Sequence, residues 1–110
     1  MERGDDPDVR ISEQISPTQM KRIVSIEVKG GGDVSNLHNR LGEAEKTHLN
    51  AKRKGYSKFW TIVHFKGFDA SKARIECPTT NLFFDLSEID NPLSESGRMF
   101  QEQIHLILGI

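Results

Sequence analysis

The sequence has little of several features on which whole classes of protein depend. It contains one cysteine, Cys77, in 110 residues, so no disulfide can form within the chain. It has no run of about 18 apolar residues, the length that a membrane-spanning helix requires. The first ten residues, MERGDDPDVR, lack the apolar stretch of a signal peptide. We therefore expect a soluble, cytoplasmic protein without internal disulfide bonds.

Metal-ligand spacings and excess charge are also missing. The spacings of the cysteine and the histidines are not those of a structural zinc site; the histidines are His38, His48, His64 and His105. The formal net charge of −1 gives the whole molecule no attraction to nucleic acid. A basic cluster at Lys52–Lys54 has an ordinary explanation, because cations at a helix end complement the helix dipole. Charge alone therefore identifies no partner.

The length of the chain and its pattern of apolar and polar residues predict one small α/β domain over residues 1–110, with the first seven residues frayed. A half-buried strand is expected over residues 8–14, before Ser16 and Pro17 break the pattern. A second strand, over residues 22–30, is rich in β-branched residues and is closed by Gly30–Gly32. We expect these two strands to form a hairpin or an adjacent pair.

The next segment predicts a long amphipathic helix over residues 33–56, capped by Asp33 or Ser35 and stopped by Gly55. Its apolar stripe consists of Leu37, Leu41, Ala44, His48 and Ala51. An almost continuously apolar strand over residues 58–65 follows, so strand, helix and strand should form a right-handed parallel crossover.

The C-terminal part predicts a short helix over residues 69–78, a strand over 81–89 and a helix over 95–109. The expected fold is therefore a mixed sheet flanked by helices, in the order β-β-α-β followed by α and β additions.

Within the second strand, Ser25, Glu27 and Lys29 share one face, opposite the apolar residues between them. Taken by themselves, Glu27 and Lys29 are also explained by a simple ion pair on an exposed face of the sheet. However, Asp8 opens the preceding strand 19 positions earlier, so the hairpin can bring two carboxylates and an ammonium group together. Mg²⁺ prefers such oxygen ligands and often takes one or two carboxylates. A nearby lysine can stabilise charge on a phosphate or orient the attacking water.

These residues carry a family resemblance. "PD" at Pro7-Asp8 followed by "EVK" at Glu27-Val28-Lys29 resembles the PD-(D/E)XK nuclease superfamily. The passage SIEVKGGGDVSNLHNRLGEAEKTHLNAKRKGY, with the following FWTIV, resembles the core of its bacterial type II restriction endonucleases. The resemblance implies a restriction-endonuclease-like fold and Mg²⁺-dependent hydrolysis of DNA, with Mn²⁺ as a substitute. It also implies Asp8 and Glu27 as metal ligands, the Val28 carbonyl as a third, and Lys29 as the catalytic lysine.

The polar face of the helix over residues 33–56 offers further candidates. Asn39, Glu43 and Lys46 are candidates for contacts to DNA or to the site, and Arg40 for a phosphate, although a solvated helix face explains them equally well. His48 lies on the apolar stripe and is expected to be a packed, hydrogen-bonded core histidine. The second histidine and the asparagine of a one-metal histidine nuclease are missing around His38.

Restriction endonucleases generally carry a helix before the Pro-Asp strand, and segments that read bases. Since Asp8 lies close to Met1, a truncated product, a fragment and a minimal catalytic core all remain open. A symmetric double-stranded DNA target favours a homodimer. Two alternatives also remain: a non-catalytic DNA-binding or interaction remnant, and a repair or structure-specific nuclease on the same core.

Overall fold

The computed structural model describes residues 7–30, 37–65 and 68–109. The elements follow the order β1 (Val9–Ser16), β2 (Gln19–Gly30), α1 (Leu37–Arg53), β3 (Lys58–His64), α2 (Ala70–Glu76), β4 (Leu82–Asp85) and α3 (Glu95–Leu108). The strands form one sheet in the order β1-β2-β3-β4. β1 runs antiparallel to β2, whereas β2, β3 and β4 are parallel to one another. The predicted mixed α/β fold is therefore confirmed.

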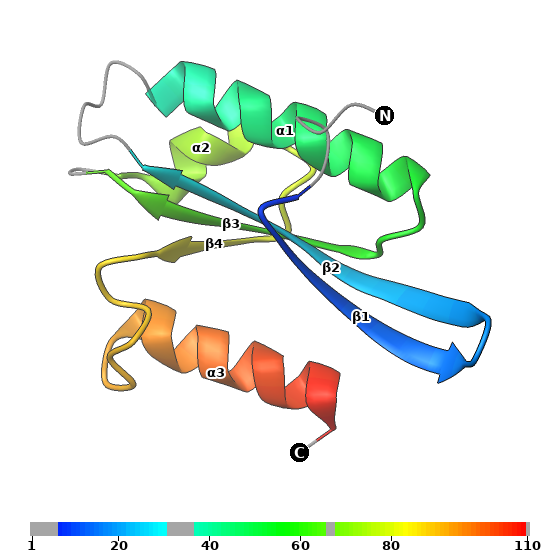
Figure 1. Cartoon of the computed structure of the whole chain (residues 1–110). Coiled ribbons are helices and arrows are strands. Elements are labelled where there is room, and N and C mark those ends of the chain that lie inside the picture. Colours follow the sequence, from blue (N-terminus) through cyan, green and yellow to red (C-terminus); the bar gives the residue numbers. More distant parts are fainter. Residues whose placement is uncertain (1–6, 31–36, 66–67, 110) are drawn as a thin grey trace.

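Helices cover both faces of the parallel part of the sheet (Figure 1). α1 and α2 lie on one face, where Leu41 and Ala44 pack with Val63 and Phe83. α3 lies on the other face, where its Phe100 makes edge-to-face contacts with Trp60 and Phe84. This double cover explains why the five residues between Lys58 and His64 are all buried.

The two-residue turn Pro17-Thr18 joins β1 to β2, as the break in the pattern predicted. β2 begins at Gln19, earlier than expected, because its first half pairs only with β1 and forms a hairpin that extends beyond β3 (Figure 1). The expectation of a half-buried first strand was wrong for most of β1. Ile15 is 56% exposed because no helix covers the projecting end of the hairpin, and Val9, at the other end of this edge strand, is 46% exposed.

The expected helix boundaries largely hold. Gly55 ends α1 with φ 107°, a conformation that residues with a side chain rarely adopt. Asp69 caps α2 by accepting a hydrogen bond from the Ser71 amide, and Ser94 caps α3 in the same manner. The proposed caps Asp33 and Ser35, the glycines at 31 and 32, and most of the predicted frayed N-terminus lie outside the described residues.

The strand expected over residues 81–89 is shorter than predicted. β4 ends at Asp85, whose carboxylate accepts hydrogen bonds from both the amide and the hydroxyl of Ser87. This local turn competes with continued pairing to β3. No helix in the described ranges is both long enough and apolar enough to cross a membrane.

Candidate active site

The β1–β2 hairpin brings the two predicted carboxylates together. Val9 pairs with Ile26, so Asp8, one residue before β1, lies beside Glu27 in β2. The Asp8 amide donates a hydrogen bond to Glu27 Oε2 at 3.0 Å. In return, the Val28 amide donates to Asp8 Oδ2 at 2.9 Å. Each acidic side chain is thus held by a backbone amide of the other strand, and the pair is fixed by the hairpin register.

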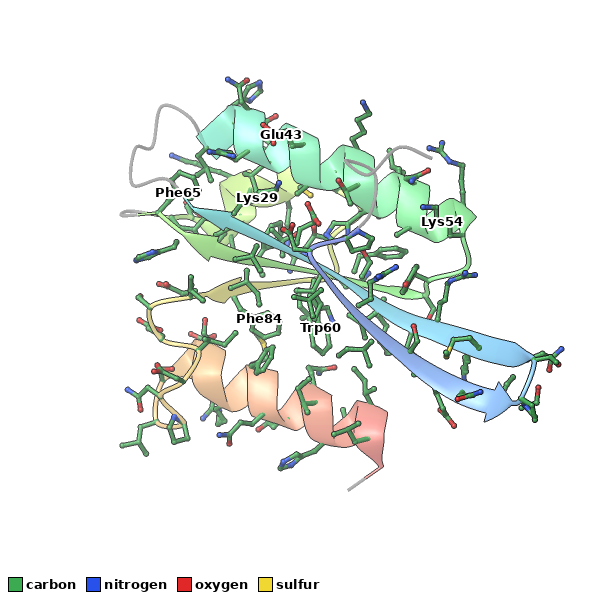
Figure 2. All side chains as sticks on the ribbon, in the orientation of Figure 1. Lys29, Glu43, Lys54, Trp60, Phe65 and Phe84 are labelled. Carbon is green, nitrogen blue, oxygen red and sulfur yellow. The ribbon has the colours of Figure 1, made fainter. Side chains whose placement is uncertain are left out.

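Lys29 completes this group from the same face of β2. Its Nζ lies 3.4 Å from Glu27 Oε1 and 3.7 Å from Glu43 Oε2 on α1. The Lys29 side chain is only 14% exposed, whereas that of Glu43 is 58% exposed. Figure 2 shows Lys29 on β2 pointing into the space beneath Glu43 on α1. The lysine therefore bridges a buried and an exposed carboxylate at the rim of the site.

Burial raises the pKa of Glu27 above its ordinary value, and the nearby charge of Asp8 adds to this effect. The Asp8 amide and Lys29 act in the opposite direction and lower the pKa. Glu27 is 2% exposed, so its negative charge is costly without a compensating cation. The electrostatics of the pair therefore favour binding of a positive ion.

The donor set fits a hard divalent cation. Among residues 7–30, 37–65 and 68–109, no three His, Cys, Asp or Glu side chains form a metal-binding group. Asp8 and Glu27 therefore have no third side chain of these types beside them in the described ranges. A set of two carboxylates, with remaining positions left to backbone oxygen, water and substrate phosphate, suits Mg²⁺. It does not suit zinc, which prefers nitrogen and sulfur ligands in a closed tetrahedral site.

A chain of buried polar side chains lies on the same side of the sheet. His48 on α1 bonds through Nδ1 to Ser25 Oγ at 2.9 Å and through Nε2 to Thr61 Oγ1 at 3.0 Å. Thr61 Oγ1 continues to Thr80 Oγ1 at 2.7 Å, and Thr80 contacts Cys77 Sγ at 3.0 Å. The prediction that His48 is a hydrogen-bonded core residue is confirmed. The other four members were not predicted, although serine and threonine inside strands with apolar neighbours were a signal for buried hydrogen bonds.

Comparison with known proteins places this sequence in a family. The family model described as XcyI restriction endonuclease matches residues 1–110, the whole chain. The chain belongs to the XcyI restriction endonuclease family. This membership confirms the resemblance to type II restriction endonucleases that the passage over residues 25–56, with the following FWTIV, indicated.

Two curated relatives of this XcyI-family chain are type II restriction enzymes. Cfr9I from Citrobacter freundii is 41% identical over 110 residues, and XcyI from Xanthomonas campestris pv. cyanopsidis is 44% identical over 110 residues. Both alignments cover 100% of this chain but 33% of the relative. The chain therefore spans about a third of the length of these relatives. No solved structure matches it significantly.

The remaining predicted site residues of this XcyI-family chain lie on α1. Glu43 reaches Lys29, as described above. Asn39, Arg40 and Lys46 are exposed, and no described contact joins them to Asp8, Glu27 or Lys29. Their assignment to DNA or to the site stays a prediction.

The state of His48 in this family member leads to a prediction about acid stability. Burial lowers the pKa of His48 from 6.5 to about 4, an effect that Glu45 opposes and Lys29 reinforces. Below pH 6.5 the unfolded chain therefore binds a proton that the folded chain does not. The His48 contribution to stability is complete above about pH 6.5 and declines as the pH falls towards 4.

We expect His48 to account for a loss of about 3 kcal/mol in the free energy of unfolding between pH 7.5 and pH 4. Urea unfolding at both pH values checks this expectation, with His48→Gln as the control that lacks the titrating ring. An equal loss in both proteins would show that His48 does not titrate as described. The comparison is needed because Glu27, with its raised pKa, contributes the opposite trend.

Proposed function

We propose that this chain carries the catalytic centre of a Mg²⁺-dependent type II restriction endonuclease that hydrolyses phosphodiester bonds of double-stranded DNA. The observation that carries the proposal is the interlocked pair of Asp8 and Glu27 with Lys29 Nζ 3.4 Å from Glu27. A buried ion pair built for stability alone would not need a second carboxylate beside it, because the added charge raises the cost of burial. The match to restriction enzymes supports the same chemistry.

Asp8 and Glu27 would hold the metal through their carboxylates. When bound, the Mg²⁺ ion lowers the pKa of a water molecule and stabilises the charge that develops on the phosphate. The protein fixes both carboxylates in advance by hydrogen bonds from the Val28 and Asp8 amides. This pre-organisation reduces the rearrangement needed for binding.

The backbone around Pro7 supports the Val28 carbonyl as a third ligand. The Val28 amide faces Asp8, and the carbonyl of a strand residue points to the same side as its amide. Extending the register of Val9 and Ile26 by two residues places Pro7 opposite Val28. Proline has no amide hydrogen, so Pro7 cannot donate to the Val28 carbonyl. The absence of a hydrogen bond from Pro7 supports a role of this carbonyl oxygen as a metal ligand next to the Asp8 carboxylate.

Lys29 would act on the water or on the phosphate. Its ammonium group is held between Glu27 and Glu43 at the rim of the site, where it can orient the attacking water or stabilise negative charge on the scissile phosphate. Arg40, exposed on α1, would contact a phosphate, and Asn39, Glu43 and Lys46 would contact DNA or support the site. Cleavage of both strands at a symmetric target asks for two such centres, which a homodimer supplies.

The proposal is tested by incubating the purified chain with mixed plasmid DNA and Mg²⁺, and sequencing the fragment ends. We expect discrete ends, and none with the Asp8→Asn chain prepared in parallel, which controls for contaminating nuclease. A chain that binds Mg²⁺ and DNA but leaves every plasmid intact would instead be a non-catalytic remnant.

A further inference from the structure

The buried chain of polar side chains has a geometry that bears on the candidate active site. His48 is 0% exposed and both of its ring nitrogens are engaged, so the ring cannot contact DNA or an attacking water. Its two partners come from different strands: Ser25 from β2 and Thr61 from β3. The ring thus ties α1 to two neighbouring strands at once.

Those two partners also flank Glu27. Ser25 lies two residues before Glu27 on the same face of β2. Thr61 is the direct neighbour of Glu27 across the parallel pairing of β2 and β3. The hydroxyl groups that hold His48 are therefore attached to the same piece of backbone that holds the buried carboxylate.

Two side chains of α1 make directional contacts here. Glu45 accepts hydrogen bonds from the amide and the hydroxyl of Thr79, in the segment before β4, whereas His48 bonds to the strands beside Glu27. Besides Leu41 and His48, the buried residues of α1 are Ala44, Thr47 and Ala51, which are all small. Small apolar contacts permit a helix to shift along a sheet at low cost, whereas hydrogen bonds of 2.9 and 3.0 Å hold only one position. His48 also packs edge-to-face on Phe59, with ring centroids 5.5 Å apart.

The position of α1 matters because Glu43 projects from it towards Lys29. Glu43 precedes His48 by five residues, a rise of about 7.5 Å along the helix. Its carboxylate is 3.7 Å from Lys29 Nζ and its side chain is 58% exposed, so its place near Lys29 depends on where α1 lies. A shift of α1 by about one ångström is enough to break such a contact, and a misplacement of that size can cost an enzyme up to about 100-fold in rate.

We propose that His48 is a positioning residue, which fixes α1 over β2 through Ser25 and Thr61 so that Glu43 holds the ammonium group of Lys29 at the site. The proposal rests on the function proposed above for Lys29, but the contact between Lys29 and Glu43 can be measured without any cleavage. His48 acts on the site through α1 and stays uncharged while doing so.

The first test measures the contact by nuclear magnetic resonance. In the native chain, Lys29→Met should change the ¹³Cδ chemical shift of the Glu43 carboxylate, because the neighbouring charge is removed. In a His48→Leu background, which keeps the bulk but loses both hydrogen bonds, we expect less than about half of this change. Phe84→Leu, a core change on the opposite face of the sheet, should leave it intact. An undiminished change in the His48→Leu protein would overturn the proposal.

Should His48→Leu fail to fold, Ser25→Ala and Thr61→Val each remove one of the two bonds, and either must reduce the Glu43 response for the proposal to stand.

The second test uses cleavage. We expect His48→Leu to lower kcat by about 10-fold or more with little change in KM, and Glu43→Gln to lower it no further in that background. Independent, multiplying effects would show that His48 does not act through Glu43. A native chain that cuts no DNA removes the proposed function, while the resonance test still decides the role of His48.

Discussion

Lys29→Ala should cut the rate of DNA cleavage by about 100-fold or more while the protein remains folded and still binds metal. The reason is that Lys29 Nζ is the only described ammonium group within 4 Å of Glu27 Oε1, at 3.4 Å. Single-turnover cleavage at saturating Mg²⁺ measures the effect, and melting curves in the same buffer confirm folding. Lys72→Ala, on the exposed face of α2, is a matched control and should cleave normally.

A purely structural ion pair predicts the reverse for Lys29→Ala: reduced stability, because Glu27 loses its partner, with cleavage preserved. That outcome would remove Lys29 from the mechanism. Lys29→Arg separates the two chemical roles, since a guanidinium group stays protonated and cannot transfer a proton. No recovery by arginine supports action on the attacking water, whereas partial recovery supports charge stabilisation alone.

Asp8→Asn should abolish detectable cleavage, a loss of about 100-fold or more, with a small effect on the fold. The asparagine retains a carbonyl oxygen that can accept the hydrogen bond from the Val28 amide, so the hairpin contact at 2.9 Å survives. What disappears is the negative charge that a divalent cation requires. Plasmid nicking over a range of Mg²⁺ concentrations measures the effect, with Asp90→Asn in an exposed turn as control. Cleavage by Asp8→Asn at the native rate would exclude Asp8 as a ligand.

Local patterns were sufficient to predict the part of the site that one hairpin builds. The alternation of Glu27 and Lys29 with apolar residues fixes their shared face, and the break at Pro17 fixes the turn that returns β2 alongside Asp8. Because Glu27 lies in β2 and Asp8 directly precedes β1, its partner in the hairpin, sequence spacing alone predicted that they come together. The projecting end of that hairpin was mispredicted because exposure depends on where the helices stop.

The buried polar chain could not be predicted in the same way. Ser25, His48, Thr61 and Thr80 come from β2, α1, β3 and the segment before β4, so their contacts exist only once the whole sheet has assembled. Similarly, the strand predicted beyond Asp85 was wrong because the Asp85 side chain forms a turn with Ser87 in place of strand pairing. The periodicity of apolar residues does not indicate such a turn.

Calorimetric titration of the chain with Mn²⁺, in the absence of DNA, measures directly whether Asp8 and Glu27 bind a metal ion. We expect the native protein to bind Mn²⁺, and Asp8→Asn and Glu27→Gln each to bind it about 10-fold or more weakly, because each change removes one of two carboxylate ligands. Glu13→Gln, on the exposed hairpin, should bind as the native chain does. Unchanged Mn²⁺ affinity in both site variants would exclude a metal site at these carboxylates and leave Asp8 and Glu27 as a structural pair.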